Sequence, residues 1–78
     1  MITTDTLKEA AKIALNFQVE RGMSYSTRAD GSHCAYDSEE SHSLCVVASL
    51  MRALSEAGEN PYDAVEYFDQ FCFNPHAW

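Results

Sequence analysis

Basic side chains are scarce in this chain, above all in its second part. The 78 residues contain five lysines and arginines against twelve aspartates and glutamates, which gives a formal net charge of −7. Residues 1–28 hold four basic and three acidic side chains, whereas residues 29–78 hold nine carboxylates and a single arginine, Arg52. A surface that binds nucleic acid or an anionic membrane needs clustered basic side chains. We therefore expect no direct binding to nucleic acid or to a membrane, and we expect a partner with a basic surface.

The sequence also lacks segments that would carry it into or across a membrane. No apolar run approaches the ~20 residues that a helix needs to span a bilayer. Residues 1–5 have neither the basic region nor the apolar region of a secretory signal. The three cysteines, Cys34, Cys45 and Cys72, are odd in number and scattered, which argues against a disulfide framework. We expect a protein of the reducing cytoplasm.

No catalytic pattern stands out. The three glycines are dispersed, so the chain has no glycine-rich phosphate-binding loop. Cys34 follows His33, but neighbouring residues on a strand point to opposite faces, so His33 is poorly placed to activate the thiol. The carboxylates on both sides of this pair should raise the thiol pKa and so lower its reactivity. We predict no catalytic residues and no enzymatic activity.

Two histidine–cysteine pairs are the strongest candidate for a metal site. His42 and Cys45 are three residues apart, Cys72 and His76 form a second pair, and together they match a Cys₂His₂ zinc set. Cys72, however, falls on the apolar arc of a predicted helix, where a free cysteine behaves as a small hydrophobic residue. Pro75 interrupts that helix before His76. We predict no metal and no cofactor, and a zinc-stabilised module is a distant alternative.

What the chain does contain is enough apolar side chain for one packed domain over residues 1–78. Hydrophobic residues make up 46% of the sequence and aromatic residues 12%, as in globular proteins. The first predicted helix spans residues 4–22, with Thr4 or Asp5 as its cap and Gly22 as its stop. Its apolar arc consists of Leu7, Ala10, Ala11, Ile13, Ala14, Leu15 and Phe17.

A second helix is predicted over residues 37–58. Asp37 and Glu40 form a capping box at its start, and Gly58 ends it. Apolar side chains such as Leu50 and Leu54 surround most of this helix, so it must lie at the centre with partners on two sides. Its single polar stripe consists of His42, Cys45, Ser49, Arg52 and Glu56.

A third helix follows, with Asn60 as its cap and Pro61 at its first position, and it ends at Asn74–Pro75. Phe68 should be nearly fully buried. The core face consists of Ala64, Val65, Phe68, Phe71 and Cys72. The outer face carries Asp63, Glu66, Asp69 and Gln70.

Residues 23–36 leave two interpretations open. Asp30–Gly31 is a hairpin turn signal, flanked by short possible strands around Tyr25 and Thr27 and around Cys34 and Tyr36. The alternative is a long ordered loop. Favouring the hairpin, we predict an α+β, mostly α fold: three helices packed around the central second helix, with a short antiparallel β-hairpin between the first and second helices.

The candidate contact surface combines carboxylates with aromatic side chains, a combination typical of protein interfaces. The predicted partner-binding residues are Asp63, Glu66, Asp69, Tyr62, Tyr67, Trp78, Glu39 and Glu40. In the competing interpretation, Tyr67 and Phe73 complete the core, Trp78 covers it, and the carboxylates only keep the protein soluble.

We expect a small acidic, non-enzymatic binding protein, an inhibitor or modulator of a larger protein or nucleoprotein complex. It would dock on a basic, nucleic-acid-binding surface, with its carboxylates in the place of phosphates. In size and charge, not in motif, such a chain is analogous to phage-encoded host-takeover and anti-CRISPR proteins. The alternative is a small homodimeric structural or regulatory adaptor, so both a monomer and a homodimer stay open.

Overall fold

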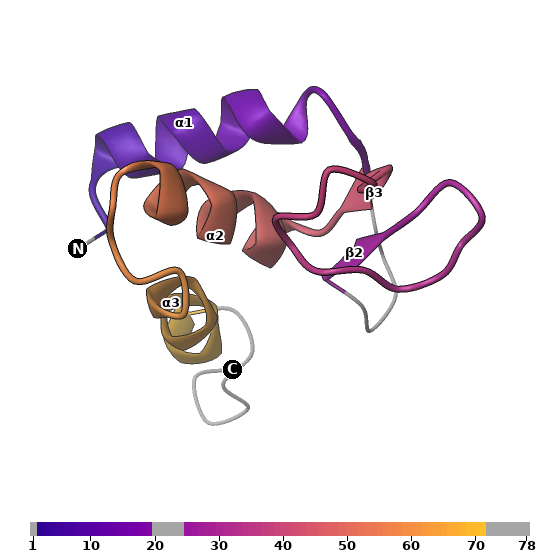
Figure 1. Cartoon of the computed structure of the whole chain (residues 1–78). Helices are drawn as coiled ribbons and strands as arrows, with labels where there is room; N and C mark the ends of the chain where they lie inside the picture. The colour runs from indigo at the N-terminus through magenta and orange to yellow at the C-terminus, as the bar shows by residue number, and fades with distance from the viewer. Residues whose placement is uncertain (1, 20–24, 72–78) are drawn as a thin grey trace.

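A computed structural model describes residues 2–19 and 25–71 of the chain (Figure 1). They form a small α+β domain in which helices dominate, as the sequence predicts. The elements, in chain order, are α1 (Thr4–Ala14), β1 (Gln18–Val19), β2 (Ser26–Thr27), β3 (Ser43–Leu44), α2 (Val46–Glu56) and α3 (Asp63–Phe71). All three predicted helices are present, but the first and second are shorter than expected.

Helix α1 begins with a reciprocal pair of threonines. The hydroxyl of Thr3 accepts a hydrogen bond from the backbone N–H of Thr6 at 3.2 Å, and the hydroxyl of Thr6 accepts one from the N–H of Thr3 at 3.2 Å. Such a capping box satisfies backbone donors that a helix start leaves unpaired. The cap is therefore Thr3, not Thr4 or Asp5 as predicted.

Helix α1 ends at Ala14, so its predicted continuation to Gly22 is wrong, and Gly22 itself lies outside the described residues. The backbone N–H groups of Asn16 and Phe17 each donate to the carbonyl three residues back, which tightens the last turn before the chain enters β1. Leu15, placed on the apolar arc by the longer helix, is 87% exposed instead.

The three strands of the described residues form one small mixed sheet in the order β1-β3-β2. The central strand β3 is parallel to β1 and antiparallel to β2. Leu44 of β3 pairs with Val19 on one side and with Ser26 on the other. Because Leu44 is also buried, β3 both connects β1 with β2 in the sheet and contributes a side chain to the core.

This pairing corrects the predicted hairpin. A turn does form at Asp30–Gly31, where the glycine has a φ of +87°, and its two arms meet at an isolated antiparallel bridge between Thr27 and His33. The strand predicted through Cys34 and Tyr36 does not form, and β2 pairs with the more distant β3. An isolated two-stranded ribbon is weak, whereas β3 is held by the core as well as by backbone bonds.

Helix α2 begins at Val46, nine residues after the predicted start at Asp37. Its cap is Cys45, whose Sγ accepts a hydrogen bond from the N–H of Ala48 at 3.3 Å. The predicted capping box with Glu40 is therefore wrong. Residues 37–44 form turns and β3 in its place.

Local side-chain bonds explain why residues 37–44 do not extend the helix. The hydroxyl of Ser38 accepts from the N–H of Glu40 at 3.1 Å, and the Glu40 carboxylate pairs with Nε of Arg28 at 2.5 Å. Side chains such as serine favour turns because they compete with helical backbone bonds. The predicted stop is confirmed: α2 ends at Glu56, and Gly58 follows with a φ of +75°.

Helix α2 supplies most of the buried side chains. It packs against α1 and also contacts α3, which is seen almost end-on in Figure 1. Leu50 and Leu54 are 1% and 0% exposed. Ser49, expected on the polar stripe, is also buried, and its hydroxyl donates to the carbonyl of Cys45 at 3.2 Å. The buried core consists of Ala10, Ile13, Leu44, Val47, Ala48, Leu50, Met51, Ala53, Leu54 and Ala64.

The start of α3 follows from the turn that precedes it. Oδ1 of Asn60 accepts from the N–H of Tyr62 at 3.0 Å, and the N–H of Asp63 donates to the carbonyl of Asn60 at 3.2 Å. Asn60 and Pro61 therefore introduce the helix, although its first residue is Asp63.

The buried face of α3 is narrower than predicted. Ala64 is fully buried, but Val65 and Phe68 are only half-buried, which corrects the expectation of a nearly buried Phe68. Cys72 and the predicted end at Asn74–Pro75 lie outside the described residues.

Candidate partner-binding face

Three carboxylates follow α3 at steps of three residues, and we name Asp63, Glu66 and Asp69 the acidic row. Glu66 and Asp69 are exposed and Asp63 is half-buried. Negative charge at the start of α3 is favourable because the helix dipole leaves that end partly positive. Within residues 2–19 and 25–71, no member of the row pairs with a lysine or arginine. Within the described residues, no basic side chain therefore offsets the charge of the row.

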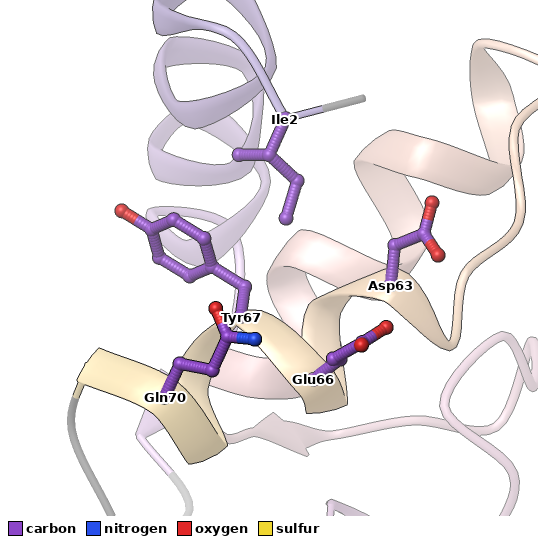
Figure 2. A pocket seen from close by; sticks show the side chains of 5 residues that line it. All are labelled: Ile2, Asp63, Glu66, Tyr67 and Gln70. Carbon is purple, nitrogen blue, oxygen red and sulfur yellow. The ribbon is translucent and has the colours of Figure 1, made fainter.

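Two members of the acidic row border a shallow hollow of about 250 Å³ (Figure 2). Asp63, Glu66, Tyr67 and Gln70 lie at helical spacings of three and four residues, so they share one side of α3. Ile2, which precedes α1, points into the space between the Tyr67 ring and the Asp63 carboxylate. These five residues form what we name the acidic hollow.

The apolar part of this hollow is held in place by the core. The Tyr67 ring packs edge-on against Phe68, with ring centroids 5.4 Å apart and planes at 85°. Both residues pack against the buried cluster. Such edge-to-face pairs restrict ring orientation. Tyr67 therefore borders the hollow and also contacts the core, as the competing interpretation expects, while its role in partner binding stays a prediction.

The other predicted binding residues lie elsewhere. Asp69 belongs to the acidic row but not to the hollow, and Tyr62 lines a different hollow near β2. Glu39 is exposed in the loop before β3, and Glu40 is engaged by Arg28, so its charge is offset. The structure thus brings Asp63, Glu66 and Tyr67 together around one hollow. The remaining predicted residues, Asp69, Tyr62, Glu39 and Glu40, lie outside it, and Trp78 lies outside the described residues.

Sequence reasoning did not include Ile2 and Gln70 among the binding residues. Gln70 had a signal, since it lies seven residues after Asp63 and hence on the same side of the helix. Ile2 had none, because its position depends on how α1 packs and not on any local pattern.

A larger hollow of about 500 Å³ opens between the 25–36 segment, α2 and the turn before α3. Sequence reasoning placed its tyrosines on strands or on an interface and did not group them. We name it the tyrosine hollow, and its principal lining residues are Tyr25, Tyr36, Tyr62, His33, Cys34 and Met51. Tyr25 and Tyr62 are 45% and 66% exposed, so the hollow is open to solvent.

Cys34 lies in this hollow beside two hydroxyl groups. Its Sγ is 3.2 Å from Oγ of Ser26 and 3.6 Å from Oγ of Ser41. The hydrogen bond with Ser26 is the main cause that lowers the pKa of the Cys34 thiol. Burial opposes this, and Ser41 and the charge of Arg28 lower the pKa further. The expectation that nearby carboxylates raise this pKa is therefore wrong.

The cysteines give no metal cluster in the described part of the chain. No three side chains among histidine, cysteine, aspartate and glutamate are placed there to hold a metal ion. Cys45 caps α2 through its sulfur. Cys72 and His76, the second half of the zinc set considered above, lie outside the described residues.

Comparison with known proteins adds no relative: no family model, no curated protein and no solved structure matches the chain. Among the described residues, every helix is too short or too polar to cross a bilayer.

Proposed function

We propose that this chain is a small acidic binding protein without enzymatic activity. It inhibits or modulates a larger protein or nucleoprotein complex by docking on a basic, nucleic-acid-binding surface. The observation that carries the proposal is the acidic row on α3, whose carboxylates have no basic partner within the described residues. The proposal places the protein in the cytoplasm. It is analogous in size and charge to phage-encoded host-takeover and anti-CRISPR proteins.

The spacing of the row supports a role in place of phosphates. With a rise of about 1.5 Å per residue, steps of three residues separate these carboxylates by about 4.5 Å along the helix axis. A single strand of duplex DNA carries one charge per about 3.4 Å of axis. A basic groove built for a nucleic-acid strand would therefore meet a comparable charge density on α3.

Apolar side chains next to the row support stable docking. Ile2 and Tyr67 lie in the acidic hollow between and beside the carboxylates. Charge complementarity mainly accelerates association and selects the partner, whereas buried aromatic and aliphatic groups slow dissociation. The acidic hollow offers both kinds of group on one face.

The test compares two variants that lose the same net charge. Asp63→Asn, Glu66→Gln and Asp69→Asn together neutralise the acidic row. Asp5→Asn, Asp37→Asn and Glu56→Gln together remove three exposed charges elsewhere. Each protein is immobilised and exposed to lysate of the source organism at low and high salt, with and without competing DNA or RNA.

The proposal predicts that wild type and the control variant capture the same nucleic-acid-binding protein or complex. Competing nucleic acid should displace it, and the row variant should fail to capture it at low salt. Equal capture by both variants would contradict the proposal. So would capture of a partner that neither high salt nor competing nucleic acid reduces.

One observation favours a second function, that of a small homodimeric adaptor. An apolar groove of about 180 Å³ lies where α1, α2 and α3 meet, and it includes Leu7, Ala10, Val46 and Phe68. Leu7 and Val46 are 40% and 59% exposed, and small residues on α1 would let a second helix approach closely. Sedimentation equilibrium over a concentration series distinguishes the two: a tight dimer, disrupted by Val46→Glu, would favour the adaptor.

A further inference from the structure

The tyrosine hollow has the chemistry of a receptor for a planar cation. The residues that line it include Tyr25, Tyr36 and Tyr62, which have aromatic rings, and Met51, which has a polarisable sulfur. A guanidinium or ammonium group is attracted to the face of such a ring when it lies within about 6 Å of the centroid. The two exposed rings leave an open mouth, which suits a side chain that enters from outside while its backbone stays in solvent.

The same fold already uses this kind of contact internally. The guanidinium carbon of Arg52 lies 4.7 Å from the centroid of the Phe17 ring. The arginine also donates to the carbonyl of Tyr36 at 2.6 Å and to the carbonyl of Ser38 at 2.9 Å. Stacking combined with carbonyl acceptors is typical of arginine, because its planar fork does both at once.

Within residues 2–19 and 25–71, no lysine or arginine side chain of the protein itself lines or occupies the hollow. Arg52 is held as above, and Arg28 is bound to the Glu40 carboxylate and donates to the carbonyl of His33. The chain as a whole has a formal net charge of −7, so it attracts a positively charged partner at long range, although no described carboxylate lines the hollow itself.

We propose that the tyrosine hollow receives one arginine side chain of the basic partner. This rests on the proposed function, which supplies a partner whose surface is rich in arginine and lysine. Arginine is favoured over lysine because the guanidinium stacks flat on tyrosine and is more weakly hydrated than an ammonium. The acidic row attracts the partner, and the hollow fixes one of its side chains.

The test uses three blocked amino acids as probes of the full-length wild-type chain. Acetyl-arginine amide carries the guanidinium, acetyl-lysine amide an ammonium, and acetyl-citrulline amide a neutral group of the same shape as arginine. Tyrosine ring signals are followed by NMR during each titration. The chain has four tyrosines, and Tyr67 lies outside the hollow, so it serves as an internal control.

We expect saturable shifts of Tyr25, Tyr36 and Tyr62 with the arginine probe and an unmoved Tyr67. The arginine probe should bind about twofold to fivefold more tightly than the citrulline probe, which is the factor expected from one exposed cation–π contact. Tyr62→Leu should weaken the arginine probe by a similar factor, whereas Tyr62→Phe should retain it because the ring remains. Equal binding of citrulline, or shifts that are not saturable or that include Tyr67 equally, would overturn the proposal.

The two proposals fail separately. Neutralising the acidic row should lower capture of the partner but leave the saturable tyrosine shifts in place, since the row does not line this hollow. If the row variant still captures the partner while Tyr62→Leu does not, the arginine site stands and the acidic contact face is wrong. If the probe titration fails while the row variant loses the partner, the acidic contact face stands and the arginine site is wrong.

Discussion

The acidic hollow and the tyrosine hollow differ in how the chain assembles them. Four of the five residues of the acidic hollow come from α3, at spacings of three and four residues. The tyrosine hollow collects side chains from the 25–36 segment, from α2 and from the turn before α3. One therefore depends on a single helix, and the other depends on how three separate segments are held together. Both in turn rely on the packing of α2.

The largest expected effect tests whether the packing of α2 holds both hollows in place. Leu54 is fully buried in α2, so Leu54→Ala should leave a cavity and lower the free energy of unfolding by about 2–5 kcal/mol. In a domain of this length the thermal midpoint should fall by at least about 8 °C. Leu15→Ala, at an 87% exposed position, should leave the midpoint unchanged. A Leu54→Ala variant that melts like wild type would contradict the central place of α2.

A smaller effect should separate the two hollows. Thr3→Ala removes the capping box of α1 and should cost about 1 kcal/mol of stability, measured by thermal or urea unfolding. Because Ile2 precedes this cap, NMR signals of the Ile2 methyl groups and the Tyr67 ring should also shift, while Tyr25 and Tyr36 should not. Thr3→Ser, which keeps the hydroxyl, is the matched control. Equal disturbance of all four side chains would show that the hollows are not independent.

The smallest effect concerns Cys34 within the tyrosine hollow. Because its pKa lies below the ordinary thiol value, alkylation by iodoacetamide should reach half its maximal rate at a lower pH in the folded chain than in the urea-unfolded chain. Between those two pKa values the unfolded chain binds more protons, so this thiol stabilises the fold increasingly as the pH rises.

Ser26→Ala should move the alkylation midpoint of Cys34 upward more than Ser41→Ala does, because the bond with Ser26 is the main cause of the lowered pKa. Peptide mapping by mass spectrometry assigns the rate to Cys34 rather than to Cys45. A midpoint that is the same in folded, unfolded and Ser26→Ala chains would contradict the hydrogen-bond assignment.

These differences explain what the sequence could predict. Helical periodicity is local, so it placed Asp63, Glu66 and Tyr67 on one contact surface and placed Leu50 and Leu54 at the centre. It missed the ends of α1 and the start of α2, where strand pairing and the turn bonds of Ser38 replaced helical propensity. Strands of two residues leave almost no pattern to read.

The tyrosine hollow could not be predicted for the same physical reason. Its residues meet because β2 pairs with β3 and because the turn at Asn60 directs the chain into α3. The prediction of a raised Cys34 pKa was wrong because it took the carboxylates that are near in sequence to be the neighbours of the thiol. In space, Ser26 and Ser41 contact the thiol, and Glu40 is bound to Arg28.

The central claim is that the acidic row is the contact face, and its most direct test is an association rate. For the partner captured above, the rate is measured over a series of salt concentrations for wild type, for the row variant (Asp63→Asn, Glu66→Gln, Asp69→Asn) and for the control variant (Asp5→Asn, Asp37→Asn, Glu56→Gln). We predict a steep fall with salt for wild type and the control, and a slow, nearly salt-independent rate for the row variant. Identical salt dependence of the row variant and the control would show that net charge, and not this face of α3, steers the partner.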